Sequence, residues 1–324
     1  MIAKRASRFA VAAQEVRSYF DYESVLVGVL DVTARLFEVS YELVAVQTWH
    51  EDVRSYDVVR AGNRIGRIHL DMHPREGKFN HAACFHIASG ILGRVLPEAA
   101  LVCNFPRGLM EHRQVQTFFH EFGHLVHEIL AGRQEWAAFA GIATEWDFVE
   151  APSQMLEEWV WDAEVLRTFA RNADGEPIPV ALVDRMREAD AFGRALLVRT
   201  QLGHAQVSYH LHVNRPADIA TLTAHWYDVS TPVACLEGAH SYASFGHLTA
   251  YGASYYTYQW SLVIARDLLS GFSGGLMDAA SAARYRREVL EPGGSRAAAD
   301  LVASFLGRPF NVDAYREWLG GARP

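Results

Sequence analysis

The residues of this chain that are best suited to chemistry form one short motif, His120-Glu121-Phe122-Gly123-His124. On a helix, residues four apart lie one above the other on a single face, so His120 and His124 can bind the same metal ion. Glu121 would then lie beside the water that such an ion carries, where it can accept a proton. The alternative is a chance match among solvated or core histidines, because the chain has 15 histidines.

The residues around the motif are apolar on most sides, which predicts a buried helix. Burying polar groups without partners costs roughly 2–7 kcal/mol each. Metal coordination would give the two histidines and the glutamate partners inside an apolar surrounding. The sequence therefore favours a zinc site over chance histidines. The apolar residues are Phe118, Phe119, Phe122, Leu125, Val126, Ile129 and Leu130.

A catalytic zinc ion takes three protein ligands and keeps one position open for water, so a third donor is needed. Glu150 is the best candidate, because it follows the motif far enough for a second helix to pack on the first. Pro152 is tolerated in a first helical turn, so we expect Glu150 at the start of that helix. Glu157 and Glu158 compete for the role, but their apolar neighbours indicate the solvent side. Asp147 is expected either to hydrogen-bond a ligating imidazole or to cap the helix.

A second group of polar aromatic residues lies between His247 and Tyr258. Tyr255 and Tyr258 are three residues apart, so on a helix they share a face and could direct two hydroxyls at one point. Such donors stabilise the oxyanion that forms during acyl transfer. A tyrosine-rich helix is, however, more often part of a core. The residues alone leave both interpretations open.

The remaining segments must position these groups. Apolar residues recur at helical spacing from Glu15 to Val39, and several β-forming stretches follow, separated by turn residues. From Val115 onward the pattern is overwhelmingly helical. We therefore expect a mainly α fold with a small antiparallel β-sheet. The predicted parts are an N-terminal extension, expected to be mobile, over 1–15, and a single catalytic domain over 16–324, with its sheet at about 40–90 and its helical part at about 110–324.

Composition narrows the class of partner and the compartment. The chain has 30 basic and 38 acidic residues, and this net charge of -8 argues against nucleic acid as a partner. Its apolar runs are too short to span a bilayer, so no membrane contact is expected. Cys84, Cys103 and Cys235 are odd in number and widely spaced, which is typical of reduced thiols in a reducing compartment. We expect a cytoplasmic location.

With these motifs in place, the chain resembles the thimet oligopeptidase/oligopeptidase A family of zinc peptidases. The similar segments occur in family order over nearly the whole chain, and jointly they are very specific. The resemblance implies the zincin-type catalytic domain of an oligopeptidase. The segments include HAACF at 81–85, HEFGH at 120–124, DFVEAPSQ at 147–154, FGH at 245–247 and YYTY at 255–258.

The resemblance also implies roles for individual residues. His120, His124 and Glu150 would bind one Zn²⁺ ion, and Glu121 would be the catalytic base. The implied activity is that of a zinc metalloendopeptidase that cleaves short, unstructured peptides internally. The residues implied to act on the scissile carbonyl or to bind the substrate backbone are Tyr258, His247, Tyr255 and Tyr251.

His81 and Ala82 belong to a further predicted strand, at about 80–87. An extended peptide can add to the exposed edge of a sheet, and the resemblance supports that role here. A purely structural strand is the alternative.

The chain departs from the family in length, because it matches only the catalytic C-terminal half. The N-terminal half normally forms the opposite wall of the substrate channel. A homo-oligomer or a partner chain could replace that wall. Two further alternatives follow: an inactive or partner-dependent relative that only binds peptides, and a processing peptidase with an open cleft.

Overall fold

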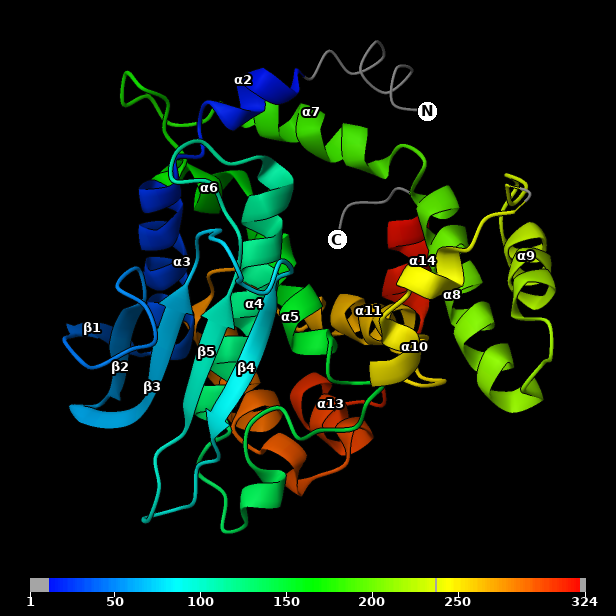
Figure 1. Cartoon of the computed structure of the whole chain (residues 1–324). Helices are drawn as coiled ribbons and strands as arrows, with labels where there is room; N and C mark the ends of the chain where they lie inside the picture. Colours follow the sequence, from blue (N-terminus) through cyan, green and yellow to red (C-terminus); the bar gives the residue numbers. More distant parts are fainter. Residues whose placement is uncertain (1–11, 237, 321–324) are drawn as a thin grey trace.

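The computed structural model describes residues 12–236 and 238–320, and most of them are helical. Five strands form one sheet at one side of the molecule (Figure 1). The extension predicted over residues 1–15 lies mostly outside the described residues, and the predicted single domain stays a prediction. The strands are β1 (Ser40–Val44), β2 (Arg54–Arg60), β3 (Asn63–Asp71), β4 (Ala83–Ala88) and β5 (Glu98–Val102).

The sheet is mixed, so the predicted purely antiparallel sheet is wrong. The strand order is β1-β2-β3-β5-β4, and β3 and β5 run parallel while the other pairs run antiparallel. The sequence prediction missed β5, whose central residues Ala99, Ala100 and Leu101 are almost fully buried. A strand buried on both faces lacks the alternation of apolar and polar residues that marks an exposed strand. β4 was predicted, and it lies at the edge of the sheet.

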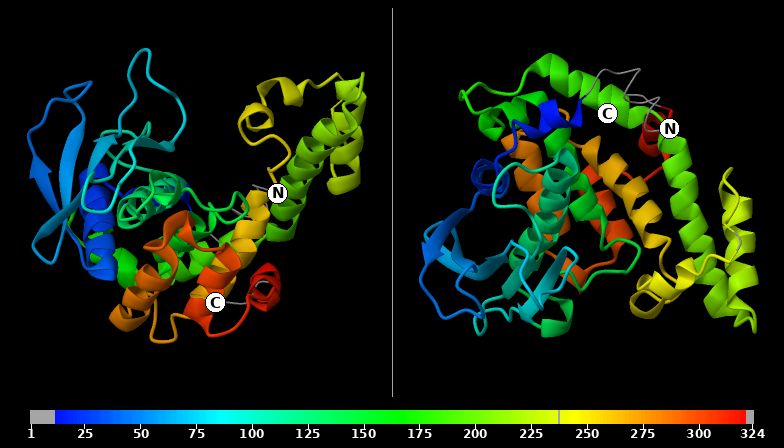
Figure 2. Two further views of the ribbon diagram at one scale, coloured as in Figure 1. Left: turned by 90° about the horizontal axis from the view of Figure 1, so that it is seen from below. Right: turned by 45° about the horizontal axis from the view of Figure 1, so that its top comes forward.

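Helices such as α3 and α4 pack against the sheet, and two other helices form a separate arm. Figure 2 shows α8 and α9 extending away from the sheet and the body that packs on it. The helices are α2 (Ala13–Arg17), α3 (Tyr22–Phe37), α4 (His112–Leu130), α5 (Ala151–Leu156), α6 (Ala163–Phe169), α7 (Val180–Ala191), α8 (Arg194–Asn214), α9 (Ile219–Ser230), α10 (His247–Ala250), α11 (Thr257–Leu269), α12 (Ala279–Tyr285), α13 (Ala298–Leu306) and α14 (Asp313–Leu319). Shorter helical turns are η1 (Ala137–Phe139), η2 (Glu157–Trp161), η3 (Ser241–Ser244), η4 (Arg286–Leu290) and η5 (Gly293–Ser295).

Helix α4 carries the H-E-x-x-H and is the central helix of the core. A capping box between Glu111 and Gln114 satisfies the free amides at its start. The predicted apolar face is confirmed, because Phe118, Phe119 and Phe122 are fully buried. The helix packs on β3, β4 and β5 on one side and on α5 on the other. It is therefore held along most of its length, which fixes the direction of its two histidines.

The end of β3 is fixed by a buried carboxylate. Asp71 accepts two hydrogen bonds from Arg75, at 2.6 and 2.7 Å, and one from Trp49 at 2.8 Å. The Lys78 ammonium lies 2.9 Å from the same carboxylate and also donates to three backbone carbonyls. Burial by itself raises the pKa of Asp71, but these donors outweigh it and hold the pKa well below its usual value. The network anchors the segment that leads into β4.

We expect Asp71→Asn to lower the free energy of unfolding by about 3–5 kcal/mol at neutral pH, because it leaves the buried Lys78 charge without its partner. The folded-state pKa of Asp71 is depressed, so its contribution is complete above the unfolded pKa near 4 and declines as the pH falls below it. Urea unfolding from pH 7 to pH 3 measures the difference between wild type and variant. The exposed pair of Asp52 and Arg107 gives the control Asp52→Asn, for which little change is expected. A difference that stays constant with pH would contradict this assignment.

Among the described residues, no helix combines the length and apolar character needed to cross a bilayer.

Candidate functional site

The predicted metal ligands converge at the contact between α4 and α5. The Nε2 atom of His120 lies 3.2 Å from Oε2 of Glu150, and the Nε2 atom of His124 lies 3.1 Å from the same oxygen. Ligands of a tetrahedral zinc ion, at about 2.0–2.2 Å from the metal, lie roughly 3.3 Å apart. Within the described part of the chain, this is the one group of three such side chains whose ligand atoms converge in this way.

Local sequence explains why Glu150 reaches this point. Glu150 is the residue directly before α5, and Pro152 occupies the first turn, as predicted. Gly123 allows the close approach of the two helices, because a Cβ atom there would lie 2.7 Å from Cα of Ser153. Ser153 Oγ donates to the Glu150 carbonyl at 3.0 Å and lies 3.3 Å from its carboxylate. The carboxylate is therefore directed at the histidines by its own helix turn.

The charges of the site suit a cation. Glu150 is 3% exposed, and a buried carboxylate needs a compensating positive group. Burial raises the pKa of Glu150, but the imidazoles of His124 and His120 outweigh it and hold the pKa well below its usual value. The buried His120 has a pKa well above its usual value because of the carboxylates of Glu150 and Glu157, which outweigh desolvation. The two histidine nitrogens and the carboxylate oxygen thus form a donor set that fits zinc.

The hydrogen-bond partner of the first histidine is Glu157, whereas Asp147 was expected either to make this type of contact or to cap the helix. Nδ1 of His120 donates to Oε1 of Glu157 at 2.6 Å, and Gln116 donates to the other carboxylate oxygen at 2.5 Å. Asp147 instead accepts from the hydroxyl of Tyr256 at 3.3 Å. The placement of Glu157 on the solvent side was therefore wrong.

A change in helix type explains this error. The α-helical α5 ends at Leu156 and continues as the 3₁₀ turn η2. The tighter turn rotates successive side chains by about 120° instead of 100°, so an α-helical projection misplaces the residues that follow. Glu157 turns toward His120, and Glu158 turns inward, where it is buried and pairs with Arg266 at 2.5 Å.

We expect Glu157→Gln to weaken zinc binding by about 10- to 100-fold, because the carboxylate orients the ligating imidazole and increases its basicity. Competition with a chelator of known zinc affinity measures the change. Glu164→Gln, an exposed position on the neighbouring α6, is the matched control and should leave the affinity unchanged. Equal zinc affinities for Glu157→Gln and wild type would disprove this positioning role.

Glu121 follows the candidate ligand His120 directly in α4. No residue within 12–236 or 238–320 hydrogen-bonds its carboxylate, and the side chain is half-buried. Its negative charge contributes to the raised pKa values of Cys84 on β4 and of Tyr251. Glu121 is therefore within electrostatic reach of both β4 and the tyrosine segment, and its carboxylate is free to accept a proton.

Tyrosines 251 and 258 and His247 face the metal ligands from the other side. The Tyr251 hydroxyl donates to Oε1 of Glu150 at 3.2 Å. The Tyr258 hydroxyl lies 3.1 Å from Nε2 of His247, and the rings of Tyr251 and Tyr258 stack with centroids 5.6 Å apart. Burial and the charge of Glu150 raise the pKa of Tyr258, so its hydroxyl keeps its proton at neutral pH. Burial lowers the pKa of His247.

Tyr255 is directed elsewhere. Its hydroxyl donates to Gln201 of α8 at 3.1 Å, and its ring packs against His204, Phe245 and His247. The geometry gives Tyr255 a role in holding the tyrosine segment on α8. Its predicted contact with substrate stays a prediction.

The segment before β4 also reaches the site. His81 is exposed, its carbonyl accepts from Asn104 at 3.1 Å, and its charge contributes to the lowered pKa of His247. His81 and Ala82 precede β4, so neither belongs to the strand itself, contrary to the predicted range. β4 is nevertheless one of the two edge strands of the sheet, with Phe85 and Ile87 exposed.

Comparison with known proteins decides the family. The model of peptidase family M3 matches residues 2–320. The chain belongs to peptidase family M3. The predicted resemblance is thereby confirmed. Relatives of this M3 chain include the thimet-like oligopeptidase of Dictyostelium discoideum, saccharolysin of Saccharomyces cerevisiae and oligopeptidase A of Escherichia coli K12, each 32% identical.

The alignments cover nearly all of this chain but only part of each relative. The three alignments cover 94%, 96% and 96% of the M3 chain but 48%, 48% and 49% of the relatives. The chain thus spans about half the length of the relatives that it matches. Two solved structures share its fold: CHT (TM-score 0.59, 11% identity, 99% of this chain and 65% of the other) and BsuCP (TM-score 0.53, 13% identity, 98% and 62%).

Proposed function

We propose that this chain is a zinc-dependent endopeptidase that hydrolyses internal bonds of short, unstructured oligopeptides. The observation that carries the proposal is the convergence of His120, His124 and Glu150. Glu121 follows His120 directly in α4, and its carboxylate has no partner among the described residues. Membership of peptidase family M3 supports it. A bound zinc ion would polarise a substrate carbonyl and lower the pKa of a water molecule toward about 7.

Different residues of the chain would transfer the proton and stabilise the negative charge of the transition state. Glu121 accepts a proton from the attacking water and returns it to the leaving amine. The protonated hydroxyl of Tyr258 donates a hydrogen bond to the developing oxyanion, supported by His247 at 3.1 Å. The free edge of β4 binds the substrate backbone by strand addition, which selects for extended peptides with little dependence on side chains.

We expect Tyr258→Phe to lower kcat by about 10²- to 10³-fold with little change in KM, because it removes a donor that acts in the transition state. Steady-state cleavage of a quenched fluorescent peptide measures both constants. Tyr256→Phe removes the hydroxyl that contacts Asp147, away from the donor set, and is the matched control. A rise in KM at constant kcat would assign Tyr258 to ground-state binding instead.

The substrate class is tested with peptides blocked at both ends, in a series of increasing length, beside a folded protein. Product masses should show cleavage at internal bonds of the short peptides and an intact folded protein. Cleavage of matched peptides with an unblocked end, but not of the blocked series, would exclude an endopeptidase, and saturable binding without cleavage would identify a peptide-binding relative. Cleavage of long or folded chains would favour a processing peptidase with an open cleft.

Partners and location remain predictions. A second copy or another chain could supply the wall opposite the site, and sedimentation with and without substrate tests this. Cys84, Cys103 and Cys235 are free thiols, which agrees with the reducing, cytoplasmic compartment that we predict.

A further inference from the structure

A large pocket lies at the carboxyl end of α4, the helix that carries His120 and His124. Its volume is about 1080 Å³, and it is bounded by the β2–β3 hairpin, the turn at 91–96, the carboxyl end of α4 and residues after η4. Ile129 and Leu130 of α4 line it, beyond the turns that carry His120 and His124. Nothing in the proposed peptidase chemistry uses this pocket.

The residues that line the pocket have an excess of positive charge, although the chain as a whole is acidic. Five arginines and one acidic residue, Glu291, line it, an excess of four positive charges, whereas the whole chain has a net charge of -8. The carboxyl end of α4 offsets only about half a charge. The arginines are Arg60, Arg64, Arg94, Arg133 and Arg287.

Most of this charge has no strong internal partner. Arg60 pairs with Glu291 at 2.6 Å. Arg64 lies 3.5 Å from Asp57, a carboxylate that already binds Arg67 at 2.8 Å. For the side chains of the other three arginines, Arg94, Arg133 and Arg287, the described residues provide no acidic or hydrogen-bonding partner. Like charges that line one pocket repel one another, and an anion would relieve that repulsion.

Hydrogen bonds connect the segments that line the pocket. The Gln134 side chain donates to the Glu291 carbonyl at 2.8 Å, and the Gln134 carbonyl accepts from the amide of Leu92 at 2.8 Å. The turn itself is closed by hydrogen bonds between Ile91 and Val95 at 2.9 and 3.0 Å. The pocket is thus preformed by the fold, as ligand sites usually are.

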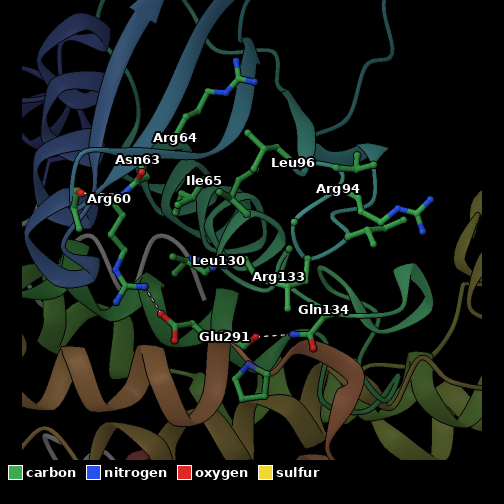
Figure 3. Close-up of a pocket in the computed structure, with 18 of the residues that line it drawn as sticks. Arg60, Asn63, Arg64, Ile65, Arg94, Leu96, Leu130, Arg133, Gln134 and Glu291 are labelled. Carbon is green, nitrogen blue, oxygen red and sulfur yellow. Dashed lines mark hydrogen bonds and ion pairs between the residues drawn. The ribbon is translucent and has the colours of Figure 1, made fainter.

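The lining combines cationic and apolar groups. Figure 3 shows Arg64 and Arg94 on two sides of the pocket, with Leu96 between them and Ile65 and Leu130 farther inside. Guanidinium groups bind phosphate oxygens in pairs and with fixed geometry. A ligand that fills this pocket therefore needs several negative charges and a body with an apolar face.

We propose that this pocket binds an organic polyphosphate, such as a nucleoside triphosphate. The phosphates would contact Arg64, Arg94, Arg133 and Arg287, and the organic part would lie against Ile65, Leu96 and Leu130. Three or four negative charges match the arginines that lack a strong partner, whereas a single carboxylate would leave most of them uncompensated. This proposal is independent of the peptidase function, because the pocket shares no residue with that site.

The test is calorimetric titration of the full zinc-loaded chain with ATP, tripolyphosphate and adenosine. We expect one ATP per chain, weaker binding of tripolyphosphate and no measurable binding of adenosine. Arg94→Ala/Arg133→Ala, two exposed positions, should weaken ATP binding at least tenfold. The control Arg35→Ala/Arg316→Ala also removes two exposed arginines, outside the pocket, and should bind ATP as wild type does. The zinc content is measured after each titration, since polyphosphates chelate zinc.

Several results would overturn the proposal. Absence of ATP binding would do so, as would equal weakening in both double variants, which would indicate unspecific attraction. Heat that coincides with loss of zinc, and is unchanged in Arg94→Ala/Arg133→Ala, would show chelation only. Equal affinity for ATP and tripolyphosphate would show that the pocket does not recognise the organic part of the ligand.

Discussion

We expect Glu121→Gln to retain zinc at one equivalent per chain and to lower kcat for peptide cleavage by about 10³-fold or more. The carboxylate is half-buried, has no partner among the described residues and is not part of the converging ligand group, so its proposed task is proton transfer rather than metal binding. General base catalysis contributes typically 10²- to 10⁴-fold, and glutamine keeps the shape while losing the basic oxygen. Metal analysis and steady-state kinetics on the same preparation measure both effects.

The matched control for this prediction is Glu135→Gln, an exposed glutamate shortly after the same helix. It makes the same chemical change and should leave kcat within about twofold, as expected for a surface substitution. Full activity in Glu121→Gln would show that Glu121 is not the catalytic base. Loss of zinc from Glu121→Gln would show instead that its carboxylate takes part in metal binding.

The second large effect is expected for His120→Ala, which should lose both zinc and peptidase activity. Removing one of three ligands costs more affinity than the roughly 10- to 100-fold expected for an outer partner. It also leaves Glu150 buried with one imidazole in place of two. His225→Ala, an exposed histidine on α9, is the control and should keep both properties.

Thermal unfolding separates lost metal binding from misfolding in this variant. A ligand that binds only the folded state adds about 2.7 kcal/mol at 100 times its Kd. Zinc should therefore raise the Tm of wild type and His225→Ala but leave that of His120→Ala unchanged, while all three unfold cooperatively without zinc. A zinc-dependent rise in Tm for His120→Ala would show that the ion binds elsewhere.

The two histidines could be predicted to share one helix face because their spacing alone places them there. His120 and His124 lie on one face of any α-helix, and Pro152 restricts Glu150 to a helix start. The role of Gly123 in the helix contact could not be read from the sequence, since it depends on the backbone of Ser153. Local rules thus predicted the ligand types, and tertiary packing brought them within bonding distance.

The errors of the sequence prediction arose where the helical periodicity changes or where strand pairing depends on residues distant in sequence. Glu157 was misplaced because the α-helix becomes a 3₁₀ turn at that residue, a change that no residue type there signals. β5 was missed because a short buried strand has no alternating pattern, and its parallel pairing with β3 depends on contacts distant in sequence. Glu128 is a further case: it hydrogen-bonds His86 on β4 at 2.6 Å, and periodicity could not predict that contact.

Zinc content and peptide cleavage, determined on one preparation of the wild-type chain, test the central claim most directly. The substrate is an oligopeptide blocked at both ends, and the products are identified by mass. The site geometry predicts one zinc ion per chain, cleavage at an internal bond, and loss and return of activity as zinc is removed and restored. One bound zinc ion per chain with no cleavage of any peptide would contradict the peptidase assignment.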